Sequence, residues 1–313
     1  MSENILITGA QGFMGNALVA FLESLNQKNL TKITRNRIFE SNGTFHDFDL
    51  QDPEKTFEVV KRVRPKIIYH LGGLSSVTTS WADPVNYVNY NTALSKSIIS
   101  AVERADPSIR VVFFSSSAVY GDKITPLLED DYLAPDTPYG MSKLLSELEI
   151  SRLQNFLLIR PFSIIGSTKK NDALDDWITQ ILKFRSSTQN TLNVGNINVI
   201  RDFLSVQDAI QMVWDLSNVS TAQGVYNLGS GIPVSLKFAV ELLLEIADID
   251  CLINQFDEPR IRKVDKQFVV ADIAKILGHK ISLPMNTLRE TLEEMYQTRK
   301  MNQTRLDLME KND

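Results

Sequence analysis

Two side chains with complementary acid-base chemistry lie four residues apart in the segment Tyr139-Gly140-Met141-Ser142-Lys143. That spacing places Tyr139 and Lys143 on the same face of a helix. A tyrosine with its ordinary pKa of about 10 exchanges protons poorly near neutral pH, and a lysine ammonium beside it favours the phenolate. The pair therefore predicts a site that moves a proton, and a half-exposed helix face without chemistry is the alternative.

A group of hydroxyl side chains follows an apolar run earlier in the chain. The serines at positions 115 to 117 close the run Val111 to Phe114 and precede the sequence Ala118 to Gly121. A hydroxyl at the end of such a strand can hydrogen-bond to a reacting carbonyl or alcohol oxygen while a tyrosine transfers the proton. Serines that only cap a strand end are the alternative.

A glycine-rich turn lies near the start of the chain, between a strand and a helix. The apolar run Ile5 to Thr8 leads into the turn, and Asn16 to Leu25 continues with helical spacing. Glycines in this arrangement let the backbone approach a pyrophosphate, which binds to the free amides at the helix start. The turn predicts a dinucleotide-binding site with these residues as contacts: Gly9, Gly12, Phe13, Met14 and Gly15.

The end of the next strand indicates which dinucleotide is bound. An acidic side chain there selects NAD, whereas an arginine accommodates the additional phosphate of NADP. The strand ends Ile33-Thr34-Arg35-Asn36-Arg37, which contains no acid. Guanidinium groups pair bidentately with phosphate, so Arg35, with Arg37 as a second candidate, favours NADP(H) over NAD. A solvated basic turn is the alternative.

Short apolar runs recur along the chain, and helical stretches follow them. This alternation predicts parallel strands with crossover helices, hence an α/β fold with a doubly wound parallel sheet. The expected strands are Ile5 to Thr8, Leu30 to Thr34, Ile67 to Leu71, Val111 to Ser115, Phe156 to Arg160 and Val225 to Leu228. The expected helices are Asn91 to Ala105, Pro138 to Leu153, Ala173 to Phe184, Val206 to Leu216, Ser235 to Ala247 and Asn286 to Arg299.

The composition restricts the partners of the chain. Its 313 residues carry a formal net charge of −5, which gives no general attraction to nucleic acid. No stretch approaches the roughly 18 uninterrupted apolar residues that a bilayer span needs, so we expect no membrane attachment. The N-terminal residues lack a basic flank and a small-residue cleavage site, so we expect a cytoplasmic protein. We expect no metal site, and an anionic ligand must be bound by arginines and helix ends.

The motifs together resemble those of the extended short-chain dehydrogenase/reductases, the NAD-dependent epimerase/dehydratase family. The turn TGAQGFMG is similar to their TGxxGFxG, and Pro126 to Lys143 matches their PxxExxxxxPxxPYGxSK layout. The resemblance implies a Rossmann domain with a smaller α/β substrate-binding lobe. It also implies a catalytic set of Ser116, Tyr139 and Lys143, in which Tyr139 and Lys143 contact the cofactor as well.

Other blocks of that family add candidate residues. The block Tyr69 to Val77 resembles HLAAxSxV, in which His70 is expected to be a buried strand residue, and Leu158 to Phe162 matches LRPxN. Asn91 matches the asparagine that opens the next helix, and the third strand is expected to end at Asp49 and Leu50. The cofactor-binding candidates from these blocks are Asp49, Leu50, Leu71, Gly72, Gly73 and Asn91. The substrate-binding candidates are Ser75, Ser117 and Ser163, where Ser163 replaces the usual asparagine.

The second half of the chain resembles a narrower group, the enzymes that modify GDP-mannose and its 4-keto-6-deoxy derivative. The segments Val194 to Val206 and Arg260 to Asp265 are similar to their VGNLxxxRDFxDV and RxRPxxV blocks. The resemblance implies that Arg201 and Arg262 bind the diphosphate of a sugar nucleotide. Ala118 stands where the dehydratases of this group have a glutamate and the epimerase-reductases a cysteine. Because alanine cannot move protons, position 118 favours simple hydride transfer.

These patterns predict a domain organisation. Residues 1–165 and 199–231 are expected to form the dinucleotide-binding domain, and residues 166–198 and 232–300 the sugar-nucleotide-binding lobe. Residues 301–313 are expected to be a polar, frayed tail. The family implies a homodimer through the helices Asn91 to Ala105 and Pro138 to Leu153.

The patterns also predict a reaction. We expect NADPH-dependent reduction of a GDP-linked 4-keto-6-deoxymannose to a GDP-6-deoxyhexose of the rhamnose type. Three alternatives stay open at this point: a sugar-nucleotide epimerase or dehydratase, a 4-keto reductase acting on a dTDP- or CDP-sugar, and a non-catalytic NADP(H)-binding regulator.

Overall fold

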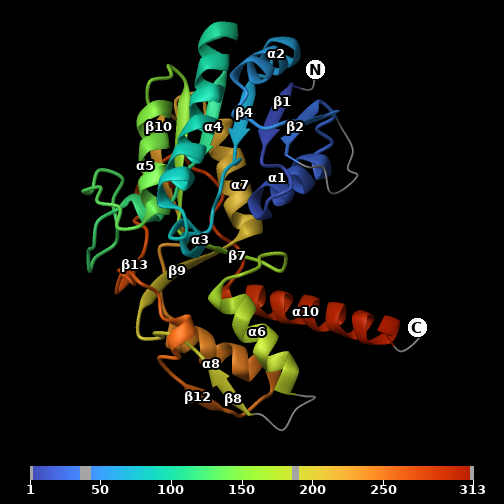
Figure 1. The fold of residues 1–313 in the computed structure, drawn as a ribbon, viewed down its shortest axis with the longest axis vertical. Coiled ribbons are helices and arrows are strands. Elements are labelled where there is room, and N and C mark those ends of the chain that lie inside the picture. Colours follow the sequence, from blue (N-terminus) through green and yellow to red (C-terminus); the bar gives the residue numbers. More distant parts are fainter. Residues whose placement is uncertain (1–2, 36–43, 185–189, 311–313) are drawn as a thin grey trace.

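The fold is built around a central parallel sheet (Figure 1). The computed structural model describes residues 3–35, 44–184 and 190–310. The seven strands have the order β10-β6-β5-β4-β1-β2-β3, and every pairing in the sheet is parallel. They are β1 (Ile5–Thr8), β2 (Leu30–Thr34), β3 (Thr44–Asp47), β4 (Ile67–His70), β5 (Arg110–Phe114), β6 (Phe156–Pro161) and β10 (Gly224–Leu228). From β1 to β3 the chain adds strands on one side of β1, and from β4 onward it adds them on the other side. This change of direction confirms the predicted doubly wound sheet.

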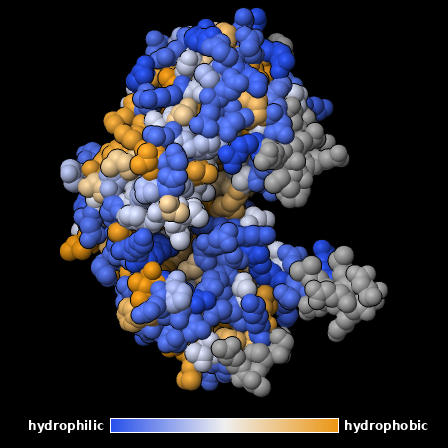
Figure 2. Space-filling view, viewed as in Figure 1, coloured by the Kyte–Doolittle hydropathy of each residue, from blue (hydrophilic) through white to orange (hydrophobic). Residues whose placement is uncertain are grey.

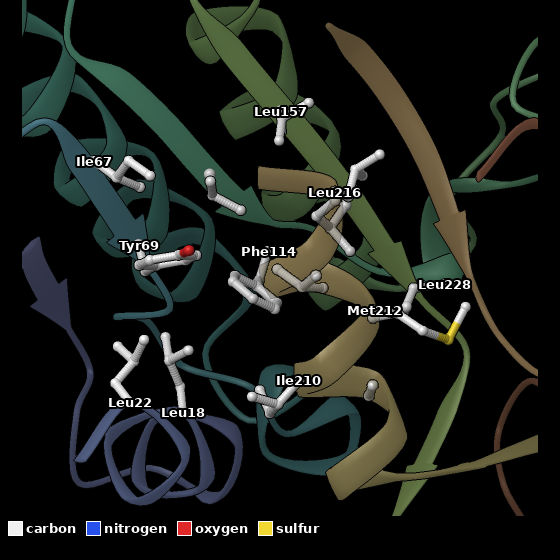
Figure 3. Close-up of a cluster of buried hydrophobic side chains, with 14 of the residues drawn as sticks. Leu18, Leu22, Ile67, Tyr69, Phe114, Leu157, Ile210, Met212, Leu216 and Leu228 are labelled. Carbon is white, nitrogen blue, oxygen red and sulfur yellow. The ribbon is translucent and has the colours of Figure 1, made fainter. Parts of the chain in front are cut away.

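Helices cover both faces of this sheet. On one face lie α1 (Phe13–Ser24) and α7 (Val206–Ser217), and on the other lie α2 (Pro53–Val63), α4 (Pro84–Ala105) and α5 (Pro138–Ile150). Figure 3 shows Leu18 and Leu22 of α1, Tyr69 of β4 and Ile210 of α7 packed together in the first layer. Because both faces are covered, the central strands β4, β5 and β6 are mostly apolar, which is why the sequence showed them as short hydrophobic runs.

A smaller α/β lobe is formed mainly by the second half of the chain. Its helices are α6 (Ala173–Phe184), α8 (Leu236–Ala247) and α10 (Leu288–Glu310), and its strands β8 (Thr191–Asn193) and β12 (Leu252–Asn254) pair in parallel. A separate buried cluster containing Trp177, Leu243 and Tyr296 holds the lobe together. Figure 2 shows the surface indented between this lobe and the Rossmann domain.

Short strands lie between the two parts in Figure 1. Those labelled there are β7 (Ser163–Ile165), β9 (Ile200–Ser205) and β13 (Phe268–Val269). A further strand, β11 (Pro233–Ser235), pairs with β9, as do β7 and β13. The remaining short helices are α3 (Val77–Ser80), η1 (Ser117–Val119), η2 (Glu258–Arg260) and α9 (Ala274–Leu277). Within the described ranges, no helix is both long and apolar enough to cross a membrane.

The start of α4 differs from the prediction. The helix begins at Pro84, and the Asp83 carboxylate caps it by accepting a hydrogen bond from the Asn86 amide. Asn91 therefore lies inside α4, and the expectation that it opens the helix is wrong. Aspartate followed by proline is a regular helix-start signal, but the apolar stripe from which the helix was predicted begins later.

The far end of α10 also differs. The helix was expected to end at Arg299, but it continues to Glu310, and Figure 1 shows this end extending away from the body of the protein. The expectation of a frayed tail is therefore wrong for residues 301–310. This segment contains no glycine or proline, so nothing in its sequence interrupts the helix.

Candidate active site

Ser116, Tyr139 and Lys143 come together at the carboxyl end of β5. Ser116 follows this strand and caps η1, because its Oγ accepts a hydrogen bond of 3.1 Å from the Ala118 amide. The Ser116 side chain lies close enough to the Tyr139 hydroxyl to lower the pKa of that hydroxyl. The Lys143 ammonium lies 6.0 Å from the centre of the Tyr139 ring. The structure thus brings the three predicted catalytic side chains into one site.

The beginning of α5 places Tyr139 in this site. Thr137 caps the helix, with its Oγ1 accepting a hydrogen bond of 3.0 Å from the Gly140 amide, and Pro138 occupies the first turn. Gly140 lies against η1, and a Cβ at this position would be 2.4 Å from the Ala118 carbonyl oxygen. Any side chain at position 140 would therefore push α5, and Tyr139 with it, away from Ser116.

Burial controls the charges in the site. The Lys143 ammonium donates a hydrogen bond of 2.8 Å to the Phe114 carbonyl. Burial lowers the pKa of Lys143 to about 8, and the nearby Glu147 carboxylate acts in the opposite direction. Burial raises the pKa of Tyr139, whereas the hydrogen bond from Ser116 lowers it. At neutral pH, Tyr139 is therefore a protonated donor next to a cation that can stabilise its phenolate.

His70 is a buried residue at the end of β4, as expected. Its Nδ1 lies 2.7 Å from the Thr8 Oγ1, which also accepts a hydrogen bond from the Gly72 amide. Burial, together with the positive charge of Lys143, lowers the pKa of His70 to about 3. The ring is therefore neutral near pH 7 and does not serve as an acid.

The glycine turn and the loop after β4 approach each other closely. Gly9 has a φ of +68°, and a Cβ there would lie 2.7 Å from the Gly72 nitrogen. Gly12 caps α1 without a side-chain hydrogen bond. The amides of the first turn of α1 are thus available to an anion, and the narrow backbone cradle fits the pyrophosphate of a dinucleotide. Phe13, Met14 and Gly15 lie in that first turn.

The loop after β4 contains Leu71, Gly72 and Gly73, and Asn91 holds it in place. The Asn91 Oδ1 accepts a hydrogen bond of 2.8 Å from the Leu74 amide, and its Nδ2 donates to the Leu74 carbonyl at 3.0 Å. The same Nδ2 donates to the Ser142 Oγ on α5 at 2.9 Å. Asn91 therefore supports the loop, and its direct contact with a cofactor stays a prediction.

Arg35 lies directly after β2 and is half-exposed. Its Nη1 donates a hydrogen bond of 2.9 Å to the Tyr90 hydroxyl and lies 3.8 Å from the Asp49 Oδ2. Asp49 follows β3, which ends at Asp47, so the expectation that the strand ends at Asp49 and Leu50 is wrong. The buried Leu50 packs in the core of the sheet face opposite α1. Arg37 lies outside the described residues.

The two arginines predicted to bind the diphosphate differ in their surroundings. Arg201 is buried on β9, where its Nη2 lies 2.5 Å from the Asp265 Oδ1. Arg262 is exposed. The burial of Arg201 is the main cause that lowers the pKa of Arg201, and the positive charge of Arg262 lowers it further. Arg201 is thus neutralised by a carboxylate, whereas Arg262 is open to solvent and close enough for its charge to act on Arg201. Arg260, in contrast, pairs with Asp176.

The three candidate serines lie on separate segments. Ser117 is the first residue of η1 and follows Ser116 directly. Ser75 is exposed in the loop between β4 and α3. Ser163 begins β7, where it pairs in register with Phe203 of β9. Contact of these hydroxyls with a substrate stays a prediction.

A buried ion pair behind the catalytic side chains was not predicted. The Arg160 Nη2 lies 2.7 Å from the Glu147 Oε2, and the two side chains are only 3% and 5% exposed. Glu147 lies four residues after Lys143, and this spacing places it on the same helix face, but it does not indicate a partner on β6.

Comparison with known proteins gives consistent matches over nearly the whole chain. The model of the NAD dependent epimerase/dehydratase family matches residues 5–229. The GDP-6-deoxy-D-mannose reductase of Pseudomonas aeruginosa is 28% identical, over 93% of this chain and 95% of that protein. The GDP-6-deoxy-D-talose 4-dehydrogenase of Aggregatibacter actinomycetemcomitans is 27% identical, over 94% and 97%. The structure of RMD from P. aeruginosa complexed with NADPH superposes with a TM-score of 0.82, 25% identity and coverage of 96% and 99%.

Proposed function

Because the chain belongs to the NAD dependent epimerase/dehydratase family, we propose that it reduces the 4-keto group of a nucleotide-linked 4-keto-6-deoxyhexose with NADPH. One observation carries the proposal. The Ser116, Tyr139 and Lys143 set is complete, and the neighbouring residue 118 is an alanine. The set is sufficient for hydride transfer coupled to protonation, whereas an elimination, or an epimerisation at a carbon next to the keto group, needs a further proton-transferring group that Ala118 does not provide.

The side chains have separate roles in the proposed reaction. A nicotinamide held in this site would supply the hydride. Ser116 and Tyr139 bind the carbonyl oxygen and stabilise the negative charge that develops on it. Tyr139 donates its proton to this oxygen, and the Lys143 ammonium stabilises the resulting phenolate. The neutral His70 beneath Lys143 takes no proton in this scheme.

We assign NADP(H) as the cofactor on the basis of Arg35. Its half-exposed guanidinium lies at the end of β2, where the fold brings the adenosine ribose of a dinucleotide. Tyr90 and Asp49 hold the guanidinium by a hydrogen bond and an ion pair. The match to a structure that contains NADPH supports this assignment.

We propose a GDP-linked sugar as the substrate. Support comes from the two relatives whose names refer to GDP-6-deoxyhexoses. Because Asp265 already neutralises Arg201, the exposed Arg262 would provide most of the positive charge for the diphosphate. Ser75, Ser117 and Ser163 remain the candidates for contacts with the sugar and its phosphates.

The reverse reaction is a second candidate function. The oxidation of a 4-hydroxyl group uses the same three side chains with Tyr139 as the proton acceptor. The similarity to a protein named a 4-dehydrogenase favours testing this direction too.

A substrate panel tests the proposed function. The purified protein is incubated with NADPH and the GDP-, dTDP- or CDP-linked 4-keto-6-deoxyhexose, and the loss of dihydronicotinamide absorbance is followed together with the sugar products. The proposal predicts fastest turnover of the GDP-linked sugar. Conversion of GDP-mannose without added NADPH would contradict it and favour an epimerase or dehydratase.

We also propose that the protein forms a homodimer through α4 and α5. Its location in the cytoplasm remains a proposal as well. The outer side of α5 exposes Met141 and Leu148, which are 40% and 60% accessible. Apolar side chains of this size on one helix suit a contact with a second copy. Light scattering of the purified protein measures the mass directly, and a monomeric mass would contradict the dimer.

A further inference from the structure

We propose that Glu147 and Arg160 act together as positioning residues. Their ion pair fixes the segments that carry Ser116 and Lys143. The Glu147 charge also holds the Lys143 ammonium beside Tyr139. The inference rests on the role that the proposed function gives to Lys143. Neither residue reaches the reacting atoms itself.

The ion pair is bidentate and shielded from water. In addition to the 2.7 Å contact, the Arg160 Nε donates a hydrogen bond of 3.0 Å to the Glu147 Oε1. Buried ion pairs are costly to desolvate, and apolar residues of similar volume often give equal or greater stability. Stability alone therefore does not account for a pair of charges at this position.

The pair holds both ends of the segment that contains Ser116. The Ser115 hydroxyl donates a hydrogen bond to the Glu147 Oε1. On the other side of η1, the Arg160 Nη1 donates a hydrogen bond of 2.9 Å to the Tyr120 hydroxyl. Since Ser115 directly precedes Ser116 and Tyr120 directly follows η1, the pair fixes the turn from which Ser116 reaches Tyr139.

The pair also determines the charge around Lys143. Glu147 lies one helical turn beyond Lys143 on α5, and its carboxylate favours the ammonium against the effect of burial. The other titratable groups around Lys143 are Tyr139 on the same helix and the neutral His70 on β4. Arg160, on β6, is the cation behind Glu147. Glu147 therefore favours the protonated form of Lys143.

A titration of Lys143 in variants of the intact protein tests this inference. Lysine side chains labelled with carbon-13 report their protonation by NMR, and the signal missing from Lys143→Arg identifies Lys143. In Glu147→Gln, which keeps the shape of the side chain and removes its charge, we expect the Lys143 midpoint to fall by about one pH unit. The matched control is Glu23→Gln, because Glu23 pairs with the buried Lys32 elsewhere in the fold, and it should leave the midpoint unchanged.

A second variant covers the case in which Glu147→Gln does not fold. The double variant Glu147→Leu, Arg160→Met removes both charges of the ion pair, so neither member is left buried without the other, and we expect it to fold. Its Lys143 midpoint should also lie below that of the wild type. An unchanged midpoint in the folded Gln variant, or in the double variant, would overturn the inference.

The activity measurement separates this inference from the proposed function. In Glu147→Gln, the alkaline limb of kcat should move to lower pH together with the Lys143 midpoint. If the midpoint moves but the wild type reduces none of the keto sugars, the proposed function fails and the effect of Glu147 on Lys143 stands. If the wild type is active and the midpoint does not move, the positioning role alone fails.

Discussion

Gly140 lies so close to Ala118 that the two residues set the distance between α5 and η1. A Cβ at position 140 would be 2.4 Å from the Ala118 carbonyl oxygen, well inside any allowed contact. The contact connects the helix of Tyr139 to the turn of Ser116. The glycine that directly follows the tyrosine in the Tyr-Gly-x-Ser-Lys motif therefore has a steric reason.

The variant Gly140→Ala should separate Tyr139 from Ser116. A displacement of about 1 Å at a catalytic group can cost roughly 100-fold in rate, so we expect a loss of that order in kcat. Binding of NADPH to the glycine turn should change little. The control is Gly278→Ala at the end of α9, where a Cβ meets nothing closer than 3.3 Å. Equal kcat values for the two variants would argue against the steric role of Gly140.

Removal of the Tyr139 hydroxyl should abolish proton donation and leave the cofactor site intact. We expect Tyr139→Phe to lower kcat by about 10²- to 10⁴-fold, the range for a general acid. Fluorescence titration with NADPH should give a Kd close to that of the wild type. A Tyr139→Phe enzyme with nearly full kcat would show that another group donates the proton.

Between pH 8 and 10, kcat should fall while the contribution of Lys143 to the free energy of unfolding should rise. Lys143 loses its proton with a pKa of about 8, so kcat should fall above that pH as the phenolate loses its cation. The folded-state pKa lies below the ordinary lysine value of 10.5, so the unfolded chain binds more protons in this interval. The contribution of Lys143 to stability is therefore unfavourable below pH 8 and improves as the pH rises towards 10.

Denaturant unfolding of wild type and Lys143→Met at several pH values isolates this contribution. The free energy of unfolding of the wild type should rise relative to that of the variant from pH 8 to 10. A constant difference across this range would contradict a lowered pKa of Lys143.

Arg35 should determine the preference between the two nicotinamide cofactors. Loss of a charged hydrogen-bond donor to phosphate weakens binding by roughly 10- to 100-fold, so Arg35→Ala should raise the Kd of NADPH by that factor. The Kd of NADH should stay the same. Arg104→Ala is a matched control, because Arg104 also contacts an aromatic ring and a carboxylate, those of Phe57 and Glu54. Equal losses for NADPH and NADH would contradict the assignment.

Much of the fold could be predicted because its signals are local. The predicted bounds of β1, β2 and α6 agree with the structure to the residue, and for β1 and α6 the apolar pattern explains the agreement. The start of α4 was misplaced because its first turn carries the cap, Asp83 and Pro84, ahead of the apolar stripe.

The site was predictable only where one segment carries the motif. Tyr139 and Lys143 share a helix, so their spacing alone indicates a common face. The partners of Arg160 and Arg201 come from distant segments: Glu147 lies on a different element, and Asp265 lies 64 residues along the chain. Such pairs depend on how strands and helices pack, which a single sequence does not specify.

Hydride transfer to the sugar is the central claim, and an isotope measurement tests it most directly. The protein is incubated with GDP-4-keto-6-deoxymannose and NADPH that carries deuterium at the transferable position, and the sugar product is examined by NMR and mass spectrometry. We predict a GDP-6-deoxyhexose with a single deuterium at C4 and one NADPH oxidised per sugar formed. A converted sugar without deuterium, formed with no net loss of NADPH, would contradict the account.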